Sequence, residues 1–300
     1  MMEVTERRIP SSDGVHQLFC RVYTPDGEVK GLFHVVHGMT EHIRRYDGFM
    51  REMAANGFVC YGFDNLGHGY TAGCDEDLGY LGKWEYMTDD VRSVTSLMKK
   101  EYGSALPCYL LGHSMGSFIV RLAATPKLWN KVIVMGTGGP NPASKVGLAL
   151  IRSSIKRKGE RAYVPGIEKL VLGGYANRFK SENDRIAWLS TKKEVRDNYR
   201  ADKYCMFHFT LNGFETLISL QSLCNSKTWF KSVSADLPLL LVSGADDPVG
   251  SFGKGVTAVY KKLKANGKNV QMKLYPGCRH EILNDTCREQ VIRDILDFIG

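Results

Sequence analysis

The pentapeptide GHSMG at residues 112–116 places Ser114 between two glycines. An apolar run, residues 107–114, leads into it, and residues 115–125 have the spacing of a helix. The serine is therefore expected at a sharp strand-to-helix turn, where flanking glycines leave room for the backbone. The start of the helix would offer unpaired N–H groups to developing negative charge. This context predicts a nucleophilic serine.

A serine hydroxyl is a poor nucleophile unless a base, itself oriented by a carboxylate, takes its proton. Where a G-x-S-x-G turn carries the serine, the carboxylate and then the histidine follow it along the chain. Two histidines follow Ser114, namely His208 and His280. His280 comes after a late apolar strand and before the last helix, so we predict that it is the base. His208 is interpreted as a packed or pocket-lining residue.

The carboxylate should follow an earlier strand, and residues 237–244 form an apolar run that ends at Asp246 and Asp247. The spacing from Gly244 favours Asp247, and Pro248 would stiffen the turn behind it. Asp246 would then be a solvated turn residue or a second hydrogen-bond acceptor.

Acyl transfer also needs two N–H donors for the oxyanion. One is expected from Met115, which follows the nucleophile, and the other from the loop after an earlier strand. Residues 34–42, HVVHGMTEH, have that placement, and the N–H of Met39 is the candidate. His37 is expected to anchor this loop. Further residues are predicted to bind substrate: Gly38, Glu41, His113 and Phe207.

Several of these side chains have an alternative, structural interpretation. Glu41, His42 and Tyr46 could line the acyl or alcohol site, or they could hold the shape of the loop. His68 and His113 are interpreted as structural or pocket-wall residues rather than catalytic ones.

Apolar strands alternate with helical segments along most of the chain, which indicates an α/β fold with a mostly parallel sheet covered on both faces. The strand-rich start has an antiparallel pattern and could supply an edge of the sheet. Residues 140–231 break the alternation with helical and aromatic stretches. We therefore expect a core formed by residues 1–139 and 232–300, with residues 140–231 inserted as a helical cap.

The net charge of +8 is concentrated in this cap. Residues 145–231 contain 17 Lys or Arg against 8 Asp or Glu, whereas the remainder is nearly neutral. Apolar residues precede a basic cluster at 152–158, so one hypothesis is an amphipathic lid that makes transient contact with an anionic membrane surface. The alternative is a solvated roof over a pocket. No recognition motif accompanies the charge, which excludes nucleic acid as a predicted partner. Aromatic residues of the cap could line an acyl tunnel or form its core: Trp188, Tyr199, Tyr204, Phe207, Phe209 and Phe214.

Eight cysteines are scattered without a C-x-x-C pair, so we expect free thiols and no metal site. The first ten residues contain no apolar signal region, and no run approaches the roughly 18 apolar residues of a membrane span. The expected location is cytoplasmic, with peripheral membrane contact as a further possibility. The sequence carries no signal for an oligomeric state.

Five motifs in order resemble the monoacylglycerol lipase and lysophospholipase group of the α/β-hydrolases. They are HGMTEHIRRY (37–46), DNLGHGYTAG (64–73), GHSMGS (112–117), SGADDPVG (243–250) and GCRHEILND (277–285). The resemblance implies a cofactor-independent hydrolase of single-chain lipid esters. It places Ser114, Asp247 and His280 in the triad, with Met39 and Met115 as oxyanion donors. Ser117 departs from the pattern, since a glycine is common there, and the cap does not match by motif.

These features predict a serine ester hydrolase that works through an acyl-enzyme on Ser114. Within the same fold a thioesterase, a peptidase or a carbon–carbon hydrolase would need the same residues. A protein of another class, a non-catalytic ligand-binding protein on the hydrolase scaffold, is the remaining alternative.

Overall fold

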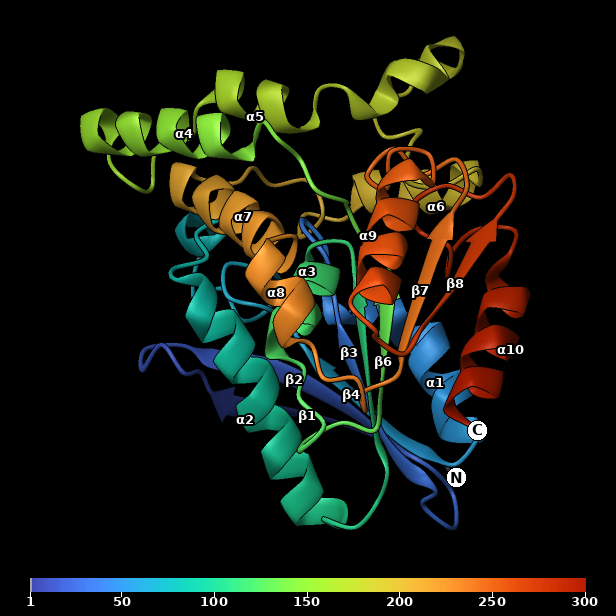
Figure 1. The fold of residues 1–300 in the computed structure, drawn as a ribbon. Helices are drawn as coiled ribbons and strands as arrows, with labels where there is room; N and C mark the ends of the chain where they lie inside the picture. The colour runs from blue at the N-terminus through green and yellow to red at the C-terminus, as the bar shows by residue number, and fades with distance from the viewer. Residues whose placement is uncertain (1) are drawn as a thin grey trace.

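The computed structural model describes residues 2–300, which contain an eight-stranded sheet of order β1-β2-β4-β3-β5-β6-β7-β8 (Figure 1). β2 pairs antiparallel with β1 and β4, and the other neighbours are parallel. The predicted fold class and its antiparallel edge are therefore confirmed. The strands are β1 (Glu3–Pro10), β2 (Gln17–Thr24), β3 (Gly31–Val36), β4 (Phe58–Phe63), β5 (Cys108–His113), β6 (Lys131–Met135), β7 (Leu239–Gly244) and β8 (Val270–Tyr275).

Helices cover both faces of the sheet because the central strands are apolar on both sides. In β5, for example, Leu110 belongs to the core on one face and Leu111 to the core on the other. The first core includes α2 (Trp84–Tyr102), α3 (Met115–Ala123) and α9 (Lys254–Ala265). The second includes α1 (Asp47–Ala55) and α10 (Arg288–Ile299). Short 3-10 helices, η1 (Ile43–Tyr46) and η2 (Asp75–Asp77), lie in the loops.

The segment expected to form the cap runs between β6 and β7 and is helical. In Figure 1, α4 and α5 lie beyond the carboxyl ends of the parallel strands, whereas α7 and α8 run down beside α3. The elements are α4 (Ser144–Lys158), α5 (Pro165–Leu172), η3 (Tyr175–Glu182), α6 (Lys193–Ala201), α7 (Leu211–Cys224) and α8 (Lys227–Ser232). Across residues 2–300, no helix combines the length and the apolar character that crossing a bilayer requires.

Two cysteines differ from the prediction. Cys278 and Cys287 form a disulfide, so the expectation of free thiols was wrong for this pair. The loop between β8 and α10 turns back on itself and brings together two residues whose spacing carries no recognisable signature. The remaining cysteines are free thiols, five of them buried and one exposed: Cys20, Cys60, Cys108, Cys205 and Cys224, and Cys74.

The turn from β5 into α3 depends on close approach of main chains. A Cβ atom on Gly112 would lie 2.3 Å from the carbonyl oxygen of Gly116, and one on Gly116 would lie 2.2 Å from that of Val36. No real Cβ contact is that short. Both glycines are therefore required by packing, and they bring the start of α3 against the end of β3.

We predict that Gly116→Ala lowers the free energy of unfolding by roughly 1–3 kcal/mol, because a main-chain carbonyl cannot move aside as a flexible side chain would. Equilibrium urea denaturation measures the change. Gly147→Ala, in α4 with open space at its Cβ position, is the matched control and should stabilise by about 0.5–1 kcal/mol. Equal stability of Gly116→Ala and the native protein would contradict the close approach.

Candidate active site

Ser114 lies between β5 and α3 with backbone angles φ 55° and ψ −118°. A positive φ is uncommon for a residue with a side chain and marks local strain, which often occurs at functional positions. The turn is held by the N–H of Ser114, which donates to the Met135 carbonyl at 3.0 Å. Ser117, where a glycine is common, donates its hydroxyl to the Ser114 carbonyl and so tightens the start of the helix. Ser114 is half-buried and lines the main cavity.

His280 and Asp247 meet at the carboxyl edge of the sheet. Nδ1 of His280 lies 2.9 Å from Oδ2 of Asp247, and both residues are buried. Asp247 is fixed in turn by the N–H of Val249 at 2.8 Å and the hydroxyl of Ser243 at 3.2 Å. A carboxylate cannot donate, so Nδ1 of His280 carries the proton and Nε2 is free to act as a base. The neighbouring Asp246 has no bond to His280.

The loop after β3 passes beside Ser114. A Cβ on Gly38 would lie 2.8 Å from the Cβ of Ser114, so glycine is needed for this approach. The N–H of Gly38 donates to Oε1 of Glu41 at 2.6 Å, which holds the loop in shape. Met39 and Met115, the predicted oxyanion donors, both line the cavity that contains Ser114 and His280.

Glu41 joins this loop to the residue preceding the serine. Oε1 of Glu41 also accepts from the Tyr46 hydroxyl at 2.9 Å and pairs with Nδ1 of His113 at 3.0 Å. Burial alone would raise the pKa of Glu41, but His113 and Arg45 outweigh it and hold that pKa below its usual range. Glu41 and His113 reach the cavity wall, but their polar atoms are engaged in this network.

Two buried histidines support the same loop from behind. Nε2 of His37 accepts from the N–H of Asn65 at 2.8 Å, so its Nδ1 donates to the Gly38 carbonyl. His68 accepts from the N–H of Thr40 at 3.3 Å, and burial lowers the pKa of His68 to about 3, so the ring is neutral. Both histidines are therefore structural.

Asp64 was missed in the sequence, although it begins the DNLGHG motif. Its carboxylate accepts from the N–H groups of Ile43 and Tyr70, each at 2.7 Å, and is fully buried. It joins the end of the loop after β3 to the loop after β4. An aspartate directly after a buried strand was the signal that could have identified it.

The main cavity has a volume of about 280 Å³ and extends from Ser114 into the cap. Its lining is mainly apolar and combines core and cap residues. Representative members are Phe118, Val146, Leu150, Leu170, Leu217 and Val249. Trp188 and Tyr199 also line it, as two of the six aromatic residues considered for an acyl tunnel.

Phe207 does not occupy the predicted position. Its ring packs against His68 at 5.3 Å and Phe209 at 6.1 Å, and it is not among the described residues that line the cavity. The structure therefore gives no support for a substrate contact of Phe207, whose ring packs against His68 instead. His208 is exposed, pairs with Glu168 at 2.7 Å and lies outside the site.

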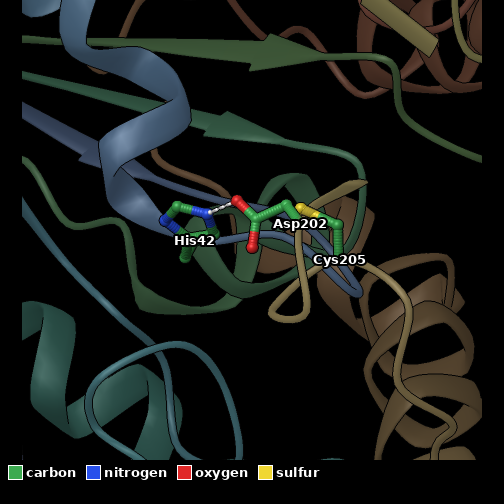
Figure 2. A group of neighbouring side chains, drawn as sticks. All are labelled: His42, Asp202 and Cys205. Atoms are coloured by element: carbon green, nitrogen blue, oxygen red, sulfur yellow. Dashed lines mark hydrogen bonds and ion pairs between the residues drawn. The ribbon is translucent and has the colours of Figure 1, made fainter. Parts of the chain in front are cut away.

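His42, Asp202 and Cys205 bring a nitrogen, an oxygen and a sulfur within 4.8 Å of one another (Figure 2). Such a set could in principle hold a metal ion. However, Nε2 of His42 and Oδ2 of Asp202 lie at the hydrogen-bond distance of 2.8 Å. Nδ1 of His42 is buried without a partner, whereas a metal-bound histidine normally donates its second ring N–H. The arrangement fits a polar contact between the loop after β3 and the helical segment between β6 and β7 better than a metal centre.

The sheet order, the strained serine turn and the Asp247–His280 pair define an α/β-hydrolase. The chain belongs to the family described as serine aminopeptidase, S33, whose model matches residues 27–287.

It is similar to the monoacylglycerol lipase of Mycolicibacterium smegmatis, with 27% identity over 281 residues, covering 93% of this chain and 91% of the relative. It is 32% identical to the monoglyceride lipase of Mus musculus over 273 residues, covering 90% and 81%. A carboxyl esterase from Bacillus coagulans, solved in complex with glycerol, superposes with a TM-score of 0.93 at 29% identity and covers 100% of this chain and 98% of that one. The chain is therefore a hydrolase, and its predicted resemblance to the monoacylglycerol lipase group is confirmed.

The buried network gives a pH-dependent contribution to stability. Burial opposes charging His113, but its hydrogen bond with Glu41 outweighs this and raises the pKa of His113 above its usual value. A group with a raised folded-state pKa stabilises most below its unfolded pKa of about 6.5, and this contribution is lost as pH rises through the folded value. We predict that the loss of unfolding free energy caused by His113→Gln is larger at pH 6 than at pH 9. Urea denaturation at both pH values measures it.

Glu41→Gln is the companion variant, because it removes the charge that His113 interacts with. It should abolish the same pH-dependent part of the stability. A penalty for His113→Gln that does not change with pH would contradict a raised pKa of His113 in the folded protein.

Proposed function

We propose that the protein hydrolyses single-chain lipid esters, such as monoacylglycerols or lysophospholipids, through an acyl-enzyme on Ser114. The observation that carries this proposal is the apolar cavity whose wall contains both Ser114 and His280. Such a cavity suits one acyl chain, whereas the amide and charged groups of a peptide would lose their hydrogen bonds to water there. The two carboxylates at its wall, Glu41 and Glu281, are already paired with Arg45, which leaves them poorly suited to bind a free amino terminus.

In the proposed mechanism His280 takes the proton of Ser114 as the hydroxyl attacks the ester carbonyl. Asp247 holds the imidazole in the reactive tautomer and stabilises its protonated form. The main-chain N–H groups of Met39 and Met115 bind the oxyanion. The alcohol leaves with a proton from His280, and water then attacks the acyl-enzyme in the same way.

We predict that Ser114→Ala lowers ester hydrolysis by at least about 10⁴-fold and abolishes labelling by a fluorophosphonate. Ser117→Ala is the matched control, since this hydroxyl lies one turn along α3 and only contacts the Ser114 carbonyl. The substrate panel contains p-nitrophenyl esters and monoacylglycerols of increasing chain length, beside thioester and aminoacyl substrates.

Long-chain esters should be preferred over aminoacyl amides. Preferred cleavage of aminoacyl amides would replace the lipid proposal by a peptidase. An unlabelled Ser114 with bound fatty acid would indicate a ligand-binding protein instead.

We further propose that the cap selects the substrate and makes transient contact with an anionic lipid surface. Three apolar side chains both line the cavity and are exposed: Val146 at 73%, Leu170 at 63% and Leu150 at 44%. They form an apolar rim that would otherwise face water. The last turn of α4 adds the exposed cluster Lys156, Arg157 and Lys158. An apolar rim beside a basic cluster is the pattern of a surface that docks on anionic lipid.

We predict that replacing Lys156, Arg157 and Lys158 by glutamine weakens binding to vesicles containing phosphatidylserine by about fivefold for each charge near the membrane surface. Vesicle sedimentation measures the binding, and vesicles of phosphatidylcholine alone are the control. Hydrolysis of a water-soluble short-chain ester should stay unchanged. Equal binding of the native protein to both kinds of vesicle would contradict the proposal.

A further inference from the structure

The loop that carries His280 is held from the side of the cap. The N–H groups of His280 and Glu281 donate to the carbonyls of Trp188 at 3.3 Å and Leu189 at 2.8 Å. The indole ring of Trp188 also packs against the imidazole, with ring centroids 5.2 Å apart. Main chain from the cap therefore helps to determine where the imidazole lies.

Asp285 fastens these two segments together. Its Oδ2 accepts from the N–H of Thr191 at 3.1 Å, in the cap, and from the N–H of Arg279 at 3.0 Å, directly before His280. Its Oδ1 accepts from the Thr191 hydroxyl and from the N–H of Thr286 at 2.9 Å. One carboxylate thus bridges the residue that precedes the base and the cap segment that the base contacts.

Asp285 is a buried carboxylate whose partners are hydrogen-bond donors rather than a cation. The side chain is fully buried, and within residues 2–300 no Lys, Arg or His pairs with it. Burying a carboxylate without a cation is unfavourable unless its oxygens are fully hydrogen-bonded. Two of its four bonds come from Thr191, and the other two come from Arg279 and Thr286 in the loop that carries His280.

We propose that Asp285 is a positioning residue for His280: by clamping Thr191 to Arg279, it holds the cap segment 188–191 as a brace that sets the imidazole against Asp247. This inference rests on the proposed function insofar as His280 is the base. The motif HEILND contains Asp285 five residues after His280, so a single loop carries both groups.

The test compares Asp285→Asn with Thr191→Val and Thr191→Ser. In Asp285→Asn, the amide NH₂ would face N–H or hydroxyl groups that are themselves donors, so bonds are lost. Thr191→Val removes only the hydroxyl contact with Asp285, and Thr191→Ser keeps that hydroxyl. We expect kcat to fall by about 10- to 100-fold in Asp285→Asn with KM changed less than about twofold, since a displacement near 1 Å can cost that much. Thr191→Val should show a smaller fall, and Thr191→Ser should recover the native rate. Asp90→Asn is the matched control: Asp90 is a buried carboxylate in α2 that accepts from Ser11 and Ser12.

A second measurement does not depend on any substrate. The proton between Asp247 and Nδ1 of His280 should give an NMR resonance downfield of the amide region. We expect it to be lost or broadened in Asp285→Asn and retained in Asp90→Asn at matched thermal stability. An unchanged resonance and kcat in Asp285→Asn would overturn the positioning role. If the native protein cleaves no ester, the proposed function fails, and the resonance alone still decides whether Asp285 positions His280.

Discussion

The geometry of the site depends on main chains that approach one another more closely than any side chain permits. Gly116 places the start of α3 against the carbonyl of Val36 at the end of β3, and Gly112 makes room for the turn before it. Once α3 lies there, the loop that continues from β3 must pass directly beside Ser114. This is why a third glycine, Gly38, is needed on the other side of the serine. The strained backbone of Ser114 and the position of the loop after β3 are thus two results of one packing constraint.

The loops around the serine lack regular secondary structure, so their buried N–H groups need other acceptors. Buried carboxylates supply them. Glu41 accepts from Gly38, Asp64 from Ile43 and Tyr70, and Asp247 from Val249. Each carboxylate therefore accepts from N–H groups that a strand or helix would otherwise satisfy, and so fixes one loop at the edge of the sheet. The cost of burying these charges is offset by the donors that they satisfy.

Much of the site could be predicted because it depends on local patterns. The serine turn and the aspartate directly follow the fully buried strands β5 and β7, and the late histidine follows the alternating strand β8. The parallel order of these strands places their carboxyl ends at one edge. β1 could not be recognised in the same way, because it is an edge strand with one buried side chain and no apolar alternation. The Cys278–Cys287 disulfide and the position of Phe207 depend on how loops cross in space. Residue spacing carries no information about such crossings.

The role of Glu41 illustrates the same limit. The sequence left open whether it contacts substrate or shapes the loop, because both functions need a carboxylate near the oxyanion donors. Three groups interact with its Oε1, and they come from Gly38, Tyr46 and His113, which belong to different elements. Only the folded chain brings them together, and the number of donors on one oxygen then favours the structural role.

The segment inserted between β6 and β7 also hydrogen-bonds to the loops that hold the site residues. Its middle part contacts the loop after β3 through Tyr199, whose hydroxyl donates to the Thr40 carbonyl at 2.8 Å. It also contacts the loop that carries His280 through the carbonyls of Trp188 and Leu189. Its helices α4 and α5 supply apolar cavity wall instead. A core without the insertion would lose the carbonyls of Trp188 and Leu189, which accept from the N–H groups of His280 and Glu281. Substitutions elsewhere in the insertion therefore have to leave residues 188–191 in place, because these residues hydrogen-bond to the loop that carries His280.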